Sequence, residues 1–156
     1  MTEATLTIRE ASEADLPGVL ALYGQPDLDN GVVLSPDEAR AVYAQFARYP
    51  HYKLYVAEQG GEIIGSYAFL LMHNLGHLGA PSAIVEDVVV DPSAQGHGVG
   101  RAMMRHAVEE ARTLGCYKLM LSSNAKRERA HAFYEQLGFE RHGYSFRINI
   151  DVGDRP

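Results

Sequence analysis

The stretch VVVDPSAQGHGVG, residues Val88–Gly100, decides how the fold of this sequence is interpreted. Three valines end a β-branched run that is typical of a buried strand, and Asp91-Pro92 stops it. Glycines at 96, 98 and 100 then lead into a helical pattern that ends near Leu114. A glycine turn that opens a helix lets the backbone approach a ligand, and the free N–H groups and dipole of the first turn attract negative charge. The stretch therefore predicts a strand, a turn and a helix that hold a pyrophosphate group.

Two nucleotide-binding motifs with a similar layout do not fit this turn. A P-loop requires Lys-Ser or Lys-Thr after its last glycine, and neither pair follows here. A dinucleotide fingerprint reads G-x-G-x-x-G and needs an acidic residue about 20 residues later. Here the spacing is G-x-G-x-G, and the next expected strand ends in LSSN at 121–124, without a carboxylate. A turn that serves only the geometry of the chain remains the alternative to a phosphate site.

Hydrophobic periodicity and turn residues divide the remaining chain into strands and helices. A Ser-Pro-Asp-Glu run at 35–38 marks a capped helix start, and Gly60-Gly61 marks a hairpin. We expect helices over residues 16–23, 36–46, 100–114 and 130–137, and strands over 6–8, 52–58, 63–71, 83–90, 117–121 and 146–150, with a further short strand near Phe139. Interleaved strands and helices predict an α/β (α+β) fold in which helices cover one mixed sheet.

Length and composition describe one globular domain over residues 1–156. Apolar residues make up 46% and charged residues 22% of the chain, which excludes disordered and collagen-like classes. The net charge of −6 argues against a protein that binds nucleic acid. Cys116 is the only cysteine, so we expect an intracellular protein without an intramolecular disulfide. The chain starts without a signal peptide and has no apolar run of membrane length, so we expect a cytoplasmic location and no membrane partner.

The charge is distributed unevenly along the chain. Residues 95–129 contain seven basic and three acidic side chains, a local charge of +4, which leaves −10 for the remainder. An acidic protein with one basic segment suggests a local site for an anion, although chance clustering on solvated helix faces would give the same count. His97 and His106 would add positive charge to this segment when protonated.

Gln95–Gly100 resembles the Q/R-x-x-G-x-G/A loop with which N-acetyltransferases of the GNAT superfamily bind the pyrophosphate of acetyl-CoA. Asn124 and the run AFYEQLGF at 132–139 resemble the second signature of that superfamily. The resemblance covers nearly the whole chain. It implies the GNAT fold, with a single mixed, mostly antiparallel sheet flanked by helices. It also implies acetyl-CoA as co-substrate, direct acetyl transfer to a primary amine, a homodimer and no metal.

The same resemblance assigns residues to the cofactor. The expected contacts are Val88, Val89, Val90, Gln95, Gly96, His97, Gly98, Val99, Gly100, Arg101, Asn124 and Phe133. A backbone N–H near Val88 is the implied donor for the oxyanion that forms during transfer. Asn124 would hydrogen-bond the pantetheine arm, and a helix N-cap is its alternative role.

Two carboxylates interrupt the apolar run at 83–90. Because neighbouring strand residues point to opposite faces, we expect Glu86 to share a face with Val88 and Val90. Only one of Glu86 and Asp87 would then face a given pocket. Desolvation would raise the pKa of a buried carboxyl toward the working range of a general base. We favour Glu86 as the base that deprotonates the amine; Asp87 as base, a salt bridge, and acceptor binding without proton transfer remain open.

Tyr134 is the general acid that the resemblance implies for the departing thiolate. An ordinary Tyr, with a pKa of about 10, is protonated at neutral pH and can protonate a thiolate whose conjugate acid has a pKa of about 8.5. Tyr134 also lies at helical spacing from Ala130, Phe133 and Leu137, so simple packing is the alternative.

Three stretches of the sequence bear on the identity of the acceptor. Val85–Val90 and GCYK at 115–118 look like glucosamine-6-phosphate N-acetyltransferases, whereas SSNAKR at 122–127 looks like aminoalkylphosphonate N-acetyltransferases. Both classes acetylate small anionic amines. Basic residues that would suit such an acceptor are Lys126, Arg127, Arg129 and Arg147. We therefore expect a small-molecule amine acceptor; a non-catalytic acyl-CoA sensor and an acetyltransferase for protein lysines or N-termini are the alternatives.

Three further residues have chemistry that needs an explanation. His73 and His77 lie four residues apart, which on a helix would suit a metal, but the nearby glycines predict a loop. We expect these histidines in the acceptor pocket or in solvent. Cys116 opens a buried strand, and we expect it in the core rather than as a nucleophile.

Overall fold

The computed structural model describes residues 4–26, 28–29, 31–123 and 126–150. By its contacts the chain divides into two compact units, Met1–Leu121 and Ser122–Pro156. The helices of the first unit are α1 (Leu16–Tyr23), α2 (Pro36–Phe46) and α3 (Val99–Thr113), and α4 (Glu128–Gln136) belongs to the second.

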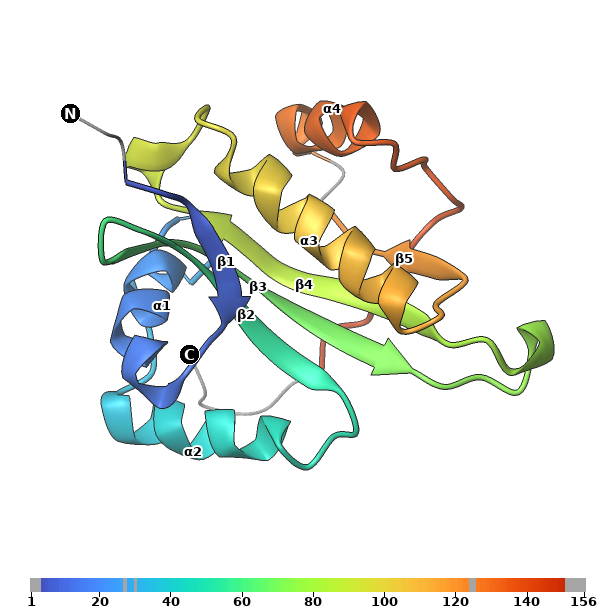
Figure 1. Ribbon diagram of the computed structural model, residues 1–156, viewed down its shortest axis with the longest axis horizontal. Coiled ribbons are helices and arrows are strands. Elements are labelled where there is room, and N and C mark those ends of the chain that lie inside the picture. Colours follow the sequence, from blue (N-terminus) through green and yellow to red (C-terminus); the bar gives the residue numbers. More distant parts are fainter. Residues whose placement is uncertain (1–3, 27, 30, 124–125, 151–156) are drawn as a thin grey trace. The chain divides into compact units, whose positions relative to one another are not determined.

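The first unit is built on a sheet with the strand order β1-β2-β3-β4-β5 (Figure 1). Its strands are β1 (Thr7–Glu10), β2 (Tyr52–Gln59), β3 (Glu62–Met72), β4 (Ser82–Val90) and β5 (Lys118–Met120). The first four strands pair antiparallel with their neighbours, and β5 joins β4 in parallel. A parallel neighbour needs a crossover connection, and α3 supplies it. The predicted mixed, mostly antiparallel sheet is thus confirmed.

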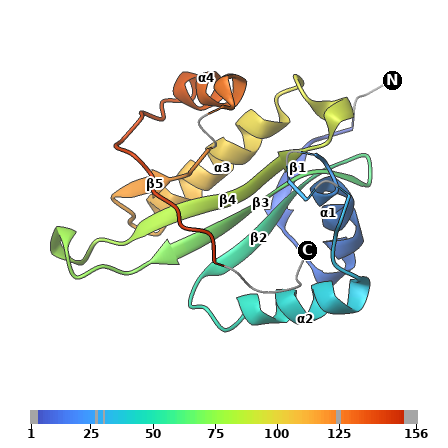
Figure 2. The ribbon, with the colours of Figure 1, turned by 180° about the vertical axis from the view of Figure 1, so that it is seen from behind.

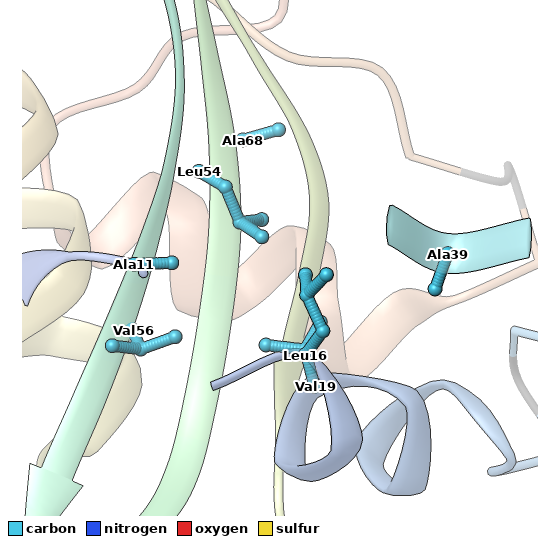
Figure 3. Packing of buried hydrophobic residues seen from close by; sticks show 7 residues of the cluster. All are labelled: Ala11, Leu16, Val19, Ala39, Leu54, Val56 and Ala68. Carbon is cyan, nitrogen blue, oxygen red and sulfur yellow. The ribbon is translucent and has the colours of Figure 1, made fainter. Parts of the chain in front are cut away.

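Helices cover both faces of this sheet, α1 and α2 on one face and α3 on the other (Figure 1, Figure 2). The core between the sheet and the pair α1 and α2 is a cluster of small and branched apolar side chains (Figure 3). Its members are Ala11, Leu16, Val19, Ala39, Leu54, Val56 and Ala68. Partly buried tyrosines extend this core: Tyr23, Tyr43 and Tyr52. The α1 and α2 face therefore offers aromatic rings next to a tightly packed apolar base.

The start of α2 follows from local chemistry. The Glu38 backbone N–H donates to Ser35 Oγ at 3.2 Å, and the Ser35 N–H donates to Glu38 Oε1 at 3.1 Å. Pro36 occupies the first helical position, where its missing N–H costs nothing. The capping box predicted at residues 35–38 is confirmed.

Gly65 on β3 brings α3 close to the sheet. A Cβ at this position would lie 3.1 Å from Val99 Cγ1 and 3.1 Å from Met103 Sδ. We expect Gly65→Ala to lower the free energy of unfolding by about 1–3 kcal/mol, because overpacking forces well-packed neighbours to shift. Denaturant unfolding measures this loss. Gly76→Ala is the matched control, since Gly76 has an extended backbone and a Cβ there would meet nothing within 4 Å; equal losses in both variants would contradict the packing argument.

The end of the chain differs from the prediction. Residues 139–150 form neither helix nor strand, although a strand was expected over 146–150 and a short one near Phe139. The side chains of Phe146 and Ile148 are 92% and 84% exposed. An alternating segment gains strand stability only when one face is buried and its backbone is paired, and sequence alternation alone supplies neither.

Across the described residues, no helix has the length and the apolar character needed to cross a membrane.

Candidate functional site

The turn between β4 and α3 has the geometry that its glycines require. Asp91–Gln95 form a tight turn around a 3-10 helix, with the Ser93 N–H donating to Asp91 Oδ1 at 2.9 Å. Gly96 and Gly98 follow with φ of 81° and 84°, the left-handed region that favours glycine. Gly98 is the N-cap of α3, and the first helical hydrogen bond runs from Ala102 N–H to its carbonyl at 3.0 Å. A Cβ at either glycine would meet nothing within 4 Å, so the space above the turn is open.

The side chains of Gln95 and His97 contact backbone carbonyl groups of the same turn. Gln95 Nε2 donates to the Val90 carbonyl at 3.4 Å, and Gln25 Nε2 from the α1–α2 connection donates to the same oxygen at 3.1 Å. His97 Nδ1 lies 3.3 Å from the Ala94 carbonyl. Since Gly98 has no side chain to cap α3, the first-turn N–H groups of the helix are the donors that an anion would find.

The ten predicted cofactor residues between Val88 and Arg101 therefore follow one continuous path from β4 through the turn into α3. They comprise the end of β4 (Val88, Val89, Val90), the turn (Gln95, Gly96, His97, Gly98) and the first turn of α3 (Val99, Gly100, Arg101). Val99 is only 3% exposed and packs into the core, so its backbone but not its side chain is available to a ligand. Gln95, Gly96, His97, Gly98 and Arg101 are exposed, and Gly100 is half-buried.

Strand β4 contains a bulge at the two carboxylates. Ala68 of β3 pairs with Glu86, and Ser66 pairs with Val89, so the single residue Tyr67 faces the two residues Asp87 and Val88. Asp87 has a φ of +53°, in the left-handed region. Asp tolerates this conformation better than most residues, which explains how the β-branched run accommodates it.

The bulge corrects the predicted faces of β4. Regular alternation placed Glu86 with Val88 and Val90, but the register places it with Val89, because the extra residue shifts the alternation by one. Since Ala68 belongs to the core under α1 and α2, Glu86 lies on that face. Whether Glu86 and Asp87 face the same pocket stays a prediction.

Tyr23 and Tyr52 respond to the carboxylates of the bulge. Burial raises the pKa of Tyr52, and the negative charges of Asp87 and Glu86 raise it further. Burial likewise raises the pKa of Tyr23, and the negative charge of Asp87 raises it further. Tyr23 and Tyr52 are residues that the site prediction missed. The sequence pattern that could have predicted the position of Tyr52 is the alternation of β2, which puts Tyr52 on the same face as Leu54 and Val56.

Glu86 and Asp87 titrate above their ordinary range. Partial burial raises the pKa of Glu86, and the neighbouring Asp87 raises it further. Partial burial also raises the pKa of Asp87, with a contribution from the charge of Asp29. Both residues are more exposed than their apolar neighbours, so the strand does not enclose them. Among the described residues neither carboxylate takes part in a salt bridge, so no cation of this part of the chain neutralises the pair.

The edge of β4 next to β5 is paired over only part of its length. The β4–β5 register covers Ser82 to Ile84 and stops there, whereas pairing with β3 continues to Val90. Within residues 4–121, the backbone of Val85–Val90 therefore has a strand on one side only. An extended molecule with amide groups could pair with such an edge.

In the second unit, α4 carries Phe133 and Tyr134. The Tyr134 ring centre lies 5.2 Å from that of Phe133, and the ring meets Phe139 edge-on at 5.8 Å, so the alternative packing role has contacts behind it. Burial raises the pKa of Tyr134, and nearby Arg127 lowers it. The Tyr134 hydroxyl is therefore protonated at neutral pH. Asn124, the predicted pantetheine contact, lies outside the described residues.

His106 corrects another expectation. Its Nδ1 lies 2.6 Å from the Tyr67 hydroxyl, and its ring meets Tyr55 edge-on at 4.7 Å. Burial lowers the pKa of His106, so the ring is neutral at neutral pH and adds no charge to the phosphate turn. His106 follows Met103 by three residues, which places it on the covered face of α3.

The other reactive side chains lie away from the bulge. The His77 ring stacks on Tyr117 at 4.1 Å, and His73 is exposed. Cys116 is half-buried, and burial raises its pKa, which disfavours the thiolate. Among the described residues, no group of three or more His, Cys, Asp or Glu side chains is arranged to hold a metal ion.

Comparisons with known proteins agree with this geometry. The profile of the Acetyltransferase (GNAT) family matches residues 19–139. The chain is 33% identical over 146 residues to a glucosamine 6-phosphate N-acetyltransferase of Trypanosoma brucei brucei, covering 93% of this chain and 96% of that protein. It is also 33% identical over 96 residues to an aminoalkylphosphonate N-acetyltransferase of Salmonella typhimurium, covering 62% of this chain and 60% of that protein.

A solved structure supports the same assignment. The crystal structure of a Trypanosoma brucei acetyltransferase superimposes with a TM-score of 0.82 and 32% identity, covering 94% of this chain and all of that one. A profile match over most of the chain and relatives of this similarity, together with the strand, glycine turn and helix described above, lead to one conclusion. The chain belongs to the GNAT family of acetyltransferases.

Proposed function

We propose that this protein transfers the acetyl group of acetyl-CoA directly to the primary amine of a small molecule. The observation that carries the proposal is the layout of β4. Its bulge presents two carboxylates of raised pKa, and its end leads straight into the glycine turn at the start of α3. The names of the relatives, which acetylate an aminosugar phosphate and aminoalkylphosphonates, support an amine acceptor.

Three parts of the chain would hold the co-substrate. The N–H groups at the start of α3 would bind the pyrophosphate, and the unpaired edge of β4 from Val85 to Val90 would hydrogen-bond the amides of the pantetheine arm. A backbone N–H near Val88 would donate to the carbonyl oxygen of the thioester. When bound, acetyl-CoA supplies an activated acetyl group.

Glu86 and Tyr134 would move the protons. Glu86 accepts the proton that the amine loses as the N–C bond forms, and its raised pKa brings its basicity closer to that of an amine. Tyr134 donates a proton to the sulfur as the C–S bond breaks. An amine that arrives protonated first gives its extra proton to solvent, and exchange with solvent after product release restores the Glu86 carboxylate and the Tyr134 hydroxyl.

Replacing Tyr134 with Phe is expected to lower kcat by about 10²-fold, because the departing sulfur loses its proton donor. The change leaves the ring contacts with Phe133 and Phe139 in place, so we expect an unchanged melting temperature. Steady-state thiol release measures kcat. A variant with wild-type kcat would show that Tyr134 only packs.

A thiol-release screen tests the proposed function as a whole. Purified protein is supplied with acetyl-CoA and, in turn, aminosugar phosphates, aminoalkylphosphonates, amino acids, polyamines, aminoglycosides and peptides. Acetylation of a small amine supports the proposal. Acetylation of peptides alone would replace it with a protein acetyltransferase, and binding of acetyl-CoA without thiol release from any amine would indicate an acyl-CoA sensor.

Cytoplasmic location and homodimer formation stay predictions. Light scattering during size-exclusion chromatography measures the oligomeric state, and a mass of twice 17.2 kDa is the expected result.

A further inference from the structure

Two glutamine side chains meet at the carbonyl oxygen of Val90, the last residue of β4. Gln25 Nε2 donates to this oxygen at 3.1 Å from the connection after α1, and Gln95 Nε2 donates to it at 3.4 Å from the glycine turn. Gln95 belongs to the predicted cofactor residues. Gln25 lies 65 residues away from Val90 in the sequence, and the chemistry proposed above gives it no role.

The peptide group between Val90 and Asp91 is held from both sides. Its N–H donates to the Ile64 carbonyl of β3 at 2.8 Å. Because the C=O and N–H of a trans peptide point in opposite directions, the Val90 carbonyl points away from β3. The pairing of β4 with β5 stops at Ile84, so within residues 4–121 no strand supplies an N–H to this oxygen. The two glutamine amides take the place of that missing strand.

The chain holds the two donors with different firmness. Gln25 follows α1 closely, and its backbone N–H donates at 3.3 Å to the carbonyl of Leu22, a core residue that is 3% exposed. The Gln25 carbonyl in turn accepts from the Leu28 N–H at 3.1 Å. Gln25 is half-buried, whereas Gln95 is exposed and makes the longer of the two bonds. Gln25 is therefore the fixed donor, and Gln95 is the donor that can leave the carbonyl more easily.

The fixed donor matters when a ligand competes for Gln95. A half-buried carbonyl that loses its hydrogen bond raises the free energy of the protein by an amount comparable to the bond itself. When Gln95 turns toward a bound pyrophosphate, the Val90 oxygen still accepts from Gln25. Without Gln25, the same movement would leave this oxygen with no side-chain donor. Gln25 thus makes the amide of Gln95 available to a ligand.

We propose that Gln25 is a positioning residue for the co-substrate. It holds the Val90 carbonyl, so that the Gln95 side chain can donate to the pyrophosphate of CoA. Gln25 acts through the end of β4 and does not touch the ligand itself. This inference rests on the acetyl-CoA binding that is part of the proposed function, and it requires no acetyl transfer.

A double-mutant cycle on CoA binding tests this role. Replacing Gln with Met keeps the length of the side chain and removes its donor. For Gln25→Met and for Gln95→Met we expect a dissociation constant about three- to tenfold higher than that of wild type, measured by calorimetric titration with CoA. The double variant should match the single variants, because Gln95 stays on the Val90 carbonyl once Gln25 is gone and then contributes nothing to CoA binding.

Gln59→Met is the matched control. Gln59 Nε2 donates to the Ala4 carbonyl at 2.9 Å, so this variant loses the same kind of bond from a half-buried side chain at the end of β2. We expect Gln25→Met and Gln59→Met to lose similar amounts of thermal stability, with unchanged CoA affinity in Gln59→Met. In turnover assays, Gln25→Met should raise the KM for acetyl-CoA and leave kcat unchanged, because Gln25 binds Val90 rather than a reacting group.

The outcomes separate this inference from the proposed function. The expected cycle supports the role of Gln25 even if no amine is acetylated, in which case only the proposed transfer fails. Wild-type CoA affinity in either single variant, or a double variant whose effect equals the product of the two single effects, overturns the role of Gln25 and leaves the proposed transfer standing. Absence of CoA binding by the wild-type protein overturns both.

Discussion

Glu86→Gln is expected to lower kcat by about 10²- to 10⁴-fold, the range in which general base catalysis contributes. Gln keeps the size of the side chain but cannot accept the proton of the amine. Thiol release under saturating acetyl-CoA measures the effect. A variant that keeps near-wild-type kcat across the pH range would remove Glu86 from the role of base.

The pH profile sharpens this prediction. Glu86 must be ionised to act, so activity falls as pH drops through its raised pKa. Glu86→Gln should lose this acidic limb, because no group at that position titrates. Asp87→Asn should keep kcat near neutral pH and move the acidic limb to lower pH, since it removes the neighbouring charge that raises the pKa of Glu86.

Asp87→Asn is also a matched control for structure. Asn tolerates the left-handed backbone of this position about as well as Asp does, so the bulge should persist. If Asp87→Asn loses activity and Glu86→Gln does not, Asp87 is the base. Loss in both variants with unchanged pH profiles would point to acceptor binding without proton transfer.

Gly98→Asp is expected to weaken CoA binding at least tenfold, whereas Gly98→Asn should weaken it far less. Both side chains tolerate the φ of 84° at this position, and a Cβ there would meet nothing within 4 Å. They differ in charge, and the Asp carboxylate would compete with pyrophosphate for the N-terminus of α3. Calorimetric titration with CoA measures both dissociation constants.

The melting temperature completes this comparison. The negative charge of an Asp at a helix N-cap interacts favourably with the helix dipole. The melting temperature of Gly98→Asp should therefore be no lower than that of Gly98→Asn. Equal CoA affinity in the two variants would mean that the turn serves only the geometry of the chain.

Local chemistry explains why much of the fold could be predicted. The capping box at Ser35 and Glu38 fixed the start of α2, and the glycines at 96 and 98 fixed the turn before α3. The capping box and the glycine turn each form from a few neighbouring residues, without contacts to distant parts of the chain. The mixed sheet followed from the interleaving of strands and helices.

The parts that escaped prediction depend on distant contacts. The residues around Asp87 in the sequence do not predict a bulge. The bulge exists because Asp87 and Val88 together face the single residue Tyr67 on β3. His106 was expected to add positive charge when protonated, but its ring contacts Tyr67 and Tyr55, which lie far from it in the sequence. The segment 146–150 alternates as a strand does, but alternation does not supply a partner.

The half-paired edge of β4 has a consequence for handling the protein. An unpaired edge with a β-branched sequence is a template on which further chains can assemble, and within residues 4–121 the segment Val85–Val90 has a strand only on the side of β3. The bulge and its two charges interrupt this template in the middle, which opposes the growth of intermolecular sheets. Preparations free of CoA should therefore aggregate sooner than saturated ones, and a valine at position 87 would remove the protection that the bulge gives.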